Sequence, residues 1–248
     1  GVDAFLIETI FDTLNAKAAI EACRRVNEER GLALPVMLSV TVSDLAGRTL
    51  SGQTLDGFLA SISSLNIFSV GLNCSFGARQ MKPYLAELAR KAPYYISAYP
   101  NAGLPNELGQ YDETAESMSP QIKEFMDEEL VNIVGGCCGT TDEFIRRYYE
   151  MSQGIKPRQL LEKPHTLWLS GLEMLDVNEN IPFVNVGERC NVAGSRKFLR
   201  LIKEKNYQEA LDIARRQVED GALVIDVNMD DGLLDAKAEM VEFLNLVA

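Results

Sequence analysis

The stretch "IFSVGLNCSFGARQMKPYLAELARKAPYYISAY", residues 67–99, contains one complete repeat of the pattern that decides the fold. It opens with a short run of apolar and β-branched residues (67–74), continues with a helical pattern (81–91) and closes on a second short apolar run (94–99). Two strands separated by a helix are expected to pair in parallel, because parallel neighbours need a long crossover connection. The near-continuous apolar runs predict a sheet that is covered on both faces.

The same alternation extends in both directions along the chain. Further strands are expected at 4–9, 35–41 and 131–136, with helices at 14–30, 54–65, 118–129 and 142–152. The pattern resumes near the C-terminus with strands at 183–188 and 223–228 and helices near 197–205, near 207–220 and from about 235. A closed (β/α)8 barrel commonly needs about 250 residues. We therefore predict an α/β protein that contains parts of two consecutive (β/α)8 TIM-type barrels with parallel strands, as a fragment of a longer chain.

A change in composition predicts where the two parts are joined. Residues 153–182 hold three prolines and two glycines and show no helical period. We expect residues 1–152 to be the C-terminal part of one barrel, 153–182 an interdomain linker, and 183–248 the N-terminal part of the next barrel. The linker is expected to pack on its neighbours through Trp168, Leu169 and Leu172.

Composition and charge narrow the classes of partner. The chain has 248 residues, is 46% hydrophobic, and has no uninterrupted apolar stretch of the roughly 18 residues that a membrane span needs. A net charge of −12 disfavours nucleic acid and anionic membranes as partners, because both require clustered Lys and Arg. We expect a soluble, cytoplasmic protein that acts on small molecules. Five cysteines without a secretory signal favour metal binding or nucleophilic chemistry over disulfides, and the single histidine, His165, argues against histidine-based sites.

Side chains able to do chemistry gather at the ends of the expected strands. In a parallel barrel the functional groups lie at the C-terminal strand ends, and these positions hold Glu8, Cys74, Asn101, Cys137 and Cys138. Three thiolates near one point form a soft ligand set that suits Zn²⁺, whose catalytic sites leave a fourth position open. The alternative is that "GGCCGTT" (135–141) is a tight turn of small residues and that Cys74 is buried independently.

The turn itself suggests how two adjacent thiols could serve one site. Thr140 and Glu143 have capping-box spacing, so a helix is expected to start there, and its positive end would favour thiolates at Cys137 and Cys138. The two remaining cysteines, Cys23 in an Ala-rich helix and Cys190 after a strand, are interpreted as structural.

The strand-end motifs also carry a family resemblance. "GLNCSFG" (71–77) and "GGCCGTT", together with "ETIFDT" (8–13) and "YPNAGLP" (99–105), resemble the homocysteine-binding barrel of zinc-dependent homocysteine methyltransferases. The resemblance implies zinc ligands at Cys74, Cys137 and Cys138, with the homocysteine sulfur in the fourth place. It implies that Asn101 fills this place without substrate and that Glu8 binds the substrate ammonium, although Glu8 could equally cap the next helix.

The second part of the chain resembles a different module. "VNVGERCNVAGSRKF" (184–198) and "VIDVNMDDGLLD" (224–235) are similar to the opening of a pterin-binding barrel that holds methyltetrahydrofolate. The matching strand-end positions implied to bind this cofactor are Glu188, Asn191, Asp226 and Asn228. Carboxylates and amides can pair with the donor and acceptor edge of a pterin. The alternative is that Asp226 and Asn228 only order their own loop.

The two modules in this order resemble the family of cobalamin-dependent methionine synthases. That resemblance implies methyl transfer from 5-methyltetrahydrofolate through cobalamin to a zinc-bound homocysteine thiolate, giving methionine and tetrahydrofolate. The sequence has no "DxHxxG" cobalamin motif, so methylcobalamin is expected to be bound by the cobalamin-binding domain of a parent chain, which would also contain a reactivation domain. The chain alone is expected to be inactive, and no residue within it is assigned as catalytic.

Two other functions stay open. A cobalamin-independent zinc homocysteine S-methyltransferase with a betaine- or sulfonium-type donor would share the first module but would not need residues 183–248. A non-enzymatic protein could use the cysteines for structural zinc or for a redox switch at Cys137 and Cys138. Structural zinc normally has a fourth Cys or His ligand, and no fourth cysteine is well placed in the sequence.

Overall fold

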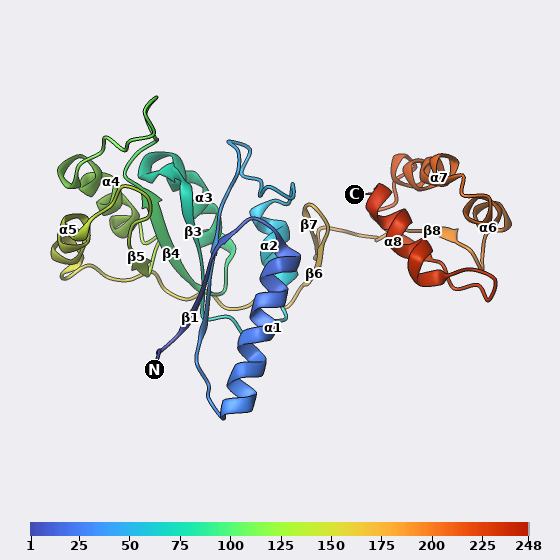
Figure 1. The fold of residues 1–248 in the computed structure, drawn as a ribbon, viewed down its shortest axis with the longest axis horizontal. Coiled ribbons are helices and arrows are strands. Elements are labelled where there is room, and N and C mark those ends of the chain that lie inside the picture. The colour runs from blue at the N-terminus through green and yellow to red at the C-terminus, as the bar shows by residue number, and fades with distance from the viewer. Residues whose placement is uncertain (248) are drawn as a thin grey trace. The chain divides into compact units, whose positions relative to one another are not determined.

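Five strands pair in chain order in the N-terminal part of the protein. The structure is a computed structural model and describes residues 1–247. All four strand pairings are parallel. The strands are β1 (Phe5–Ile10), β2 (Val36–Val40), β3 (Ser69–Gly77), β4 (Tyr95–Asn101) and β5 (Ile133–Val134). The helices that alternate with them are α1 (Thr13–Arg30), α2 (Leu55–Ile62), α3 (Ala78–Lys91), α4 (Ala115–Asp127) and α5 (Asp142–Ser152) (Figure 1).

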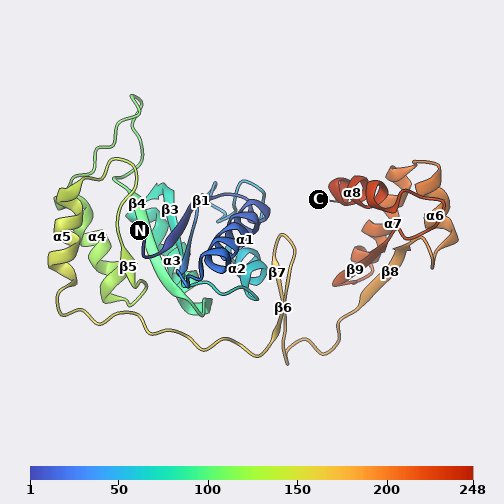
Figure 2. The same cartoon turned by 60° about the horizontal axis from the view of Figure 1, so that its bottom comes forward.

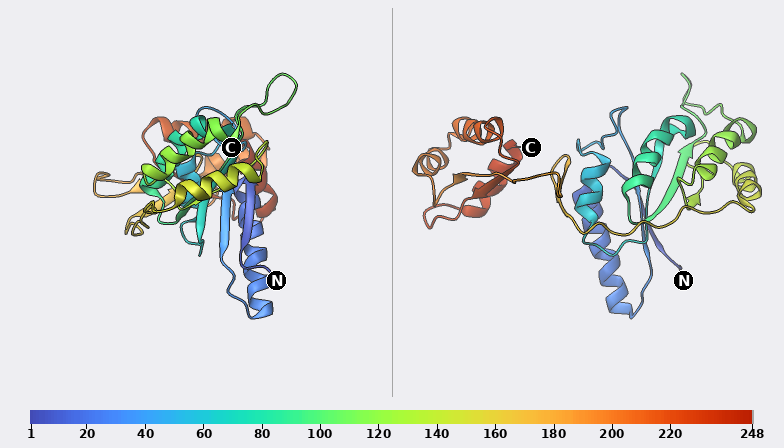
Figure 3. Two further views of the ribbon diagram at one scale, coloured as in Figure 1. Left: turned by 90° about the vertical axis from the view of Figure 1, so that its left-hand side faces the viewer. Right: turned by 180° about the vertical axis from the view of Figure 1, so that it is seen from behind.

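The helices form one layer over one face of the sheet. Each of α1 to α4 contacts the next helix along the chain, and the arrangement can be followed in two further views (Figure 3). Strand side chains that face this layer, such as Leu38, Val70 and Leu72, are at most 2% exposed. A parallel sheet in chain order with its helices on one face is the architecture of part of a (β/α)8 barrel. The predicted fold class is therefore confirmed.

The opposite face of the sheet carries small and polar side chains. Successive strand residues point to opposite faces, so Ser39 lies on the face opposite Leu38. Ser39, Ser69, Asn73 and Ser97 are all at most 1% exposed. Asn73, at the C-terminal end of this face, directly precedes the candidate site residue Cys74.

A short two-stranded sheet that the sequence did not predict lies within residues 153–182. Strands β6 (Leu167–Ser170) and β7 (Met174–Val177) form a hairpin beside α2 (Figure 2). The hairpin is tied to the α2 region by backbone hydrogen bonds, since Thr54 N donates to Leu172 O over 2.8 Å. Trp168 packs against the core. Leu172 is 53% exposed, so it contributes less packing than expected.

The chain divides into two compact units, Gly1–Asp176 and a second that begins at Val177. The second unit contains the parallel pair β8 (Val186–Asn191) and β9 (Val224–Asn228), with α6 (Arg196–Lys203), α7 (Tyr207–Glu219) and α8 (Ala236–Val247). Its own core includes Phe198, Leu201 and Phe243. Strand β8 begins three residues later than expected from the sequence. The predicted domain boundaries at 152 and 183 stay a prediction.

Within residues 1–247, no helix has both the length and the apolar character that a membrane crossing requires.

Candidate metal centre

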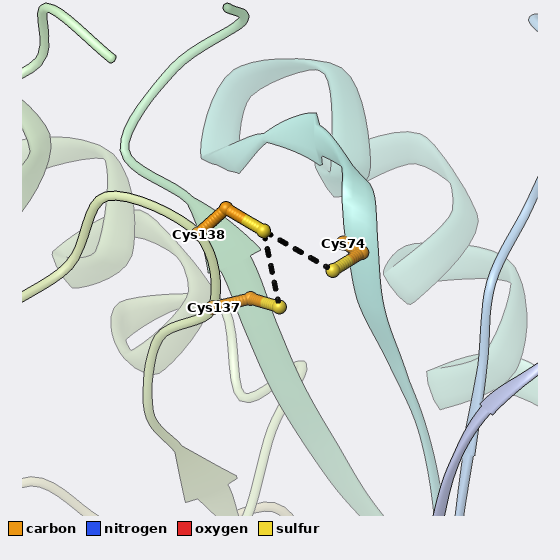
Figure 4. A group of neighbouring side chains, drawn as sticks. All are labelled: Cys74, Cys137 and Cys138. Atoms are coloured by element: carbon orange, nitrogen blue, oxygen red, sulfur yellow. Dashed lines mark hydrogen bonds between the residues drawn. The ribbon is translucent and has the colours of Figure 1, made fainter. Parts of the chain in front are cut away.

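Three cysteine side chains from two strand ends converge on one point. Cys74 lies in the last part of β3, and Cys137 and Cys138 lie in the loop between β5 and α5. The Sγ atoms of Cys74 and Cys138 are 3.8 Å apart, those of Cys137 and Cys138 are 4.0 Å apart, and all three lie within 4.8 Å of one another (Figure 4). The structure thus brings together the three thiols that the sequence singled out.

The sulfur spacing fits a tetrahedral zinc site. With Zn–S bonds of about 2.3 Å, two sulfurs on a tetrahedron are separated by about 3.8 Å. The two measured pairs match this edge length closely. The cluster supplies three soft donors, and among residues 1–247 no fourth cysteine or histidine joins it. One coordination position of a bound zinc ion would therefore stay available for another ligand.

The loop that carries Cys137 and Cys138 is fixed to the end of β4. Cys137 N donates to Pro100 O over 2.9 Å, and Ala102 N donates to Cys138 O over 2.8 Å. Asn101 is only 4% exposed, and its Oδ1 accepts a hydrogen bond from Cys138 N over 3.1 Å. Both thiols are therefore positioned by backbone contacts with the neighbouring strand.

The glycines of this loop are required by close contacts. A Cβ on Gly135 would lie 2.8 Å from the Tyr99 ring, and a Cβ on Gly139 would lie 2.5 Å from Tyr111 Cβ. Gly139 also has a positive φ of 78°, a conformation that glycine adopts without steric cost.

The expected capping box at Thr140 was wrong. Helix α5 begins at Asp142 with Thr141 at its N-cap and no side-chain cap hydrogen bond. The Thr140 hydroxyl instead donates to Cys137 O over 2.7 Å. The hydroxyl therefore closes the turn around the cysteines, and α5 still begins at the expected residue, Asp142.

The thiols differ in their pKa values because their neighbours differ. Burial, followed by the neighbouring thiols of Cys137 and Cys138, raises the pKa of Cys74 to about 12. The pKa of Cys138 is lowered, first by a hydrogen bond with the Tyr111 hydroxyl. Crowded thiols oppose the ionisation of one another, and a bound divalent cation reverses this effect. The cluster is therefore suited to a cation.

Tyr111 could not be identified from the sequence as part of this site. It lies in the long loop between β4 and α4, 27 positions before Cys138 in the chain. No motif or spacing marks it. Its contact with the cysteine loop exists only because Gly139 leaves room for its side chain.

Glu8 lies on β1, away from the contacts that hold the cysteines together. It is exposed, and its charge contributes, after burial of the ring, to the raised pKa of Tyr99 on β4. Tyr99 is the β4 residue that pairs with Asn73, directly before Cys74. Glu8 and the thiols therefore lie along the same end of the sheet. Roles in substrate binding stay predictions for both Glu8 and Asn101.

Comparison with known families gives the first unit an assignment. Residues 1–151 match the family described as homocysteine S-methyltransferase. This chain belongs to the homocysteine S-methyltransferase family. Residues 187–248 match the family described as pterin binding enzyme. The three thiols thus lie in the unit that matches this family, and a unit that matches pterin binding enzymes follows it.

Solved structures of this kind are similar to part of the chain. The homocysteine methyltransferase MmuM from Escherichia coli in its apo form has 20% identity and a TM-score of 0.45, with 61% of this chain and 51% of that chain covered. Its oxidized form has 21% identity and a TM-score of 0.45, with 60% of this chain and 46% of that chain covered. The chain spans about half the length of these solved homocysteine methyltransferases.

The unit that matches pterin binding enzymes holds a second group of polar side chains. Asn191, at the end of β8, donates from Nδ2 to Asp226 Oδ2 of β9 over 3.4 Å. Its Oδ1 accepts hydrogen bonds from the backbone of Ala193 and Gly194. The amide therefore orders its own loop and, at the same time, orients the carboxylate.

The other two predicted cofactor-binding residues are placed differently. Asn228 Oδ1 accepts a hydrogen bond from Asp230 N over 2.7 Å, so this amide oxygen orders its own loop. The Glu188 side chain is 76% exposed and lies 4.0 Å from Arg189. The structure brings Asn191 and Asp226 into contact, and within residues 1–247 Glu188 forms no hydrogen bond with either of them. Cofactor binding by all four residues stays a prediction.

Cys23 and Cys190 lie apart from the cluster. Cys23 in α1 packs against the first core, and Cys190 in β8 is buried and accepts a hydrogen bond from Gln217 Nε2 over 3.3 Å. These packed environments agree with their interpretation as structural residues.

Proposed function

We propose that this chain is part of a cobalamin-dependent methionine synthase, which transfers a methyl group from 5-methyltetrahydrofolate through cobalamin to homocysteine. The observation that carries the proposal is the presence of two units in one chain: a homocysteine S-methyltransferase unit with a three-thiol cluster and a pterin-type unit. An enzyme with a betaine- or sulfonium-type donor would have no use for a pterin. The products are methionine and tetrahydrofolate.

In the first unit, Cys74, Cys137 and Cys138 would hold zinc. When bound, zinc lowers the pKa of a coordinated thiol and offers its fourth position to the homocysteine sulfur. Asn101 keeps the cysteine loop on β4 through its hydrogen bond to Cys138 N. Glu8 would pair with the substrate ammonium from the neighbouring end of β1.

In the second unit, Asp226 and Asn191 would bind the amino-pyrimidinone edge of the pterin. This edge presents donors and acceptors together, so an oriented carboxylate is a suitable partner. The hydrogen bond between Asn191 and Asp226 orients that carboxylate before any ligand arrives. Glu188 and Asn228 would bind at the periphery of the same site.

The methyl carrier would come from elsewhere in a parent protein. Methylcobalamin would be held by a cobalamin-binding domain and kept active by a reactivation domain of that protein, and the chain alone would not turn over. All five cysteines are free thiols, which suits the reducing cytoplasm.

The test is 5-methyltetrahydrofolate binding to the full-length protein that contains this chain, measured by calorimetry. Asp226→Asn is expected to weaken binding at least about tenfold, because a charged hydrogen-bond partner is lost. The matched control is Asp212→Asn, an exposed carboxylate of α7 paired with Arg215, which should bind like wild type. Absence of saturable folate binding by the wild-type protein would contradict the proposal and favour the alternative donor.

A further inference from the structure

The buried side-chain amide of Asn73 connects β3, which carries the proposed zinc ligand Cys74, with β1, which carries the proposed substrate-binding residue Glu8. Asn73 is 1% exposed and immediately precedes Cys74. Its Oδ1 accepts hydrogen bonds from Thr9 N over 3.0 Å and from Ser39 Oγ over 2.7 Å. Its Nδ2 donates to Thr9 Oγ1 over 3.0 Å. The side chain of this β3 residue therefore contacts both β1 and β2.

The orientation of this amide follows from its partners. The backbone N–H of Thr9 can only donate, so the atom facing it must be the amide oxygen. The main chain of Asn73 is also held, since Thr41 Oγ1 donates to Asn73 O over 3.2 Å. Residues of β1, of β2 and of the segment directly after β2 thus hold Asn73, and every contact lies at the same end of the sheet.

The residues that this amide touches or precedes have unusual backbone conformations. Thr9 has a φ of 58°, and Cys74 and Ser75 both have a φ of 57°. A β-branched residue at positive φ is a true outlier, and such residues persist only where the surroundings hold them. The β1 register shifts between Ile7 and Ile10, and the β3 register shifts between Asn73 and Gly77. Both strands therefore leave regular geometry directly beside the Asn73 amide.

We propose that Asn73 is a positioning residue that holds the metal-binding Cys74 and the substrate-facing end of β1 in one fixed arrangement. It touches neither metal nor substrate and acts through Thr9 and Cys74. This inference rests on the proposed function, because it assigns the two ends that Asn73 holds to zinc and to homocysteine. Removal of a residue that orients a metal ligand without binding the metal typically weakens metal binding by about 10–100-fold.

The test uses the 248-residue chain loaded with Co²⁺ under reducing, anaerobic conditions. The visible d–d absorption of Co²⁺ reports tetrahedral thiolate coordination, and its change on titration with homocysteine reports substrate binding. Asn73→Ala is expected to alter the Co²⁺ spectrum, weaken metal binding at least about tenfold and weaken the homocysteine response. Thr9→Val keeps the side-chain shape but removes one partner of Asn73, so it should weaken homocysteine binding several-fold and leave the Co²⁺ spectrum unchanged.

The matched control is Ser69→Ala on the same strand. Ser69 is fully buried, and its hydroxyl has no hydrogen-bond partner among the described residues. This variant should leave both signals at wild-type values. If Asn73→Ala matches Ser69→Ala in both signals, the inference is wrong. If Asn73→Ala does not fold, Thr9→Val decides: homocysteine binding equal to that of the control overturns the inference.

The two levels of the proposal can fail separately. A wild-type chain that binds Co²⁺ without a tetrahedral thiolate spectrum contradicts the proposed zinc function. A normal wild-type spectrum with insensitive Asn73 and Thr9 variants overturns only the role of Asn73.

Discussion

At the scale of single residues, the site is built from strained positions that hydrogen bonds hold in place. Thr9, Cys74 and Ser75 have left-handed backbones although none of them is glycine. Each such residue costs on the order of 1–3 kcal/mol, and clusters of them are found at functional sites. The Asn73 amide bonds Thr9, and the Thr41 hydroxyl bonds the carbonyl of Asn73 directly before Cys74. Glycine could not replace Thr9 or Cys74, because the Thr9 hydroxyl bonds Asn73 and the Cys74 thiol belongs to the cluster.

Cys74→Ser is expected to weaken zinc binding by at least two orders of magnitude, because a thiolate is replaced by a hydroxyl that stays protonated at neutral pH. Zinc affinity can be measured by competition with a coloured chelator. Cys23→Ser is the matched control, since Cys23 lies in α1 outside the cluster. Equal zinc affinities for the two variants would exclude Cys74 as a ligand.

At the scale of secondary structure elements, hydrophobic patterns predicted most of the fold. Strands β1 to β5 and helices α1 to α5 lie where the alternation of apolar runs and helical patterns indicated. The β6–β7 hairpin was not predicted, because its side chains are half-buried or exposed and lack a clean alternation. Its position depends on side-chain contacts such as that of Gln53 Nε2 with Gly171 O, 118 residues apart. Such distant pairings leave no local signal.

Within the first unit, Arg158 anchors the segment that follows α5. This side chain is 5% exposed and donates to the carbonyls of Ala89, Ala92 and Tyr94. Burial lowers the pKa of Arg158. The anchor has no carboxylate partner among these contacts, so its stability comes from carbonyl acceptors alone.

Arg158→Met is expected to destabilise the first unit by about 2–4 kcal/mol, because the carbonyls of Ala89, Ala92 and Tyr94 lose a charged donor. Chemical denaturation followed by tryptophan fluorescence can measure this, since Trp168 lies in the anchored segment. Lys156→Met is the control, because the Lys156 side chain is 69% exposed. A destabilisation no larger than that of the control would show that Arg158 is not an anchor.

Within the second unit, the buried carboxylate of Glu239 holds helix α8 to Lys205 and Tyr207. Glu239 is 4% exposed and accepts hydrogen bonds from Lys205 Nζ and from Tyr207 Oη, the latter over 2.7 Å. Burial alone would raise the pKa of Glu239, but these two hydrogen bonds and the charge of Lys205 together lower the pKa below the usual 4.5. The carboxylate is therefore more acidic in the folded state than in the unfolded state.

This difference predicts a dependence of stability on pH. A lowered pKa contributes stability that is fully present above the unfolded value near 4.5 and is lost as the pH falls through the folded value. Glu239→Gln should therefore lower stability by about 1–3 kcal/mol at neutral pH and flatten the acid limb of the stability profile. Circular dichroism during denaturant titration between neutral and acidic pH can measure both. An unchanged acid limb in the variant would contradict this role.

At the scale of the whole molecule, strand ends were more informative than any other part of the sequence. The convergence of Cys74, Cys137 and Cys138 could be predicted because parallel strands in chain order bring their C-terminal ends together. The roles of Tyr111 and Asn73 could not be predicted, because both depend on contacts whose partners are distant in the chain.

In the second unit, the contact of Asn191 with Asp226 followed from neighbouring strand ends, whereas Glu188 lies exposed in an irregular part of β8. At Thr140 the capping-box pattern was misleading, because the hydroxyl donates to Cys137 O and does not cap α5.

The central claim is that the three-thiol cluster holds zinc with one position open to homocysteine. X-ray absorption spectroscopy at the zinc edge, on the zinc-loaded chain with and without homocysteine, tests it most directly. The account predicts three sulfur ligands and one nitrogen or oxygen ligand at rest, changing to four sulfur ligands when homocysteine is bound. Fewer than three sulfurs at rest, or a coordination shell that saturating homocysteine leaves unchanged, would contradict it.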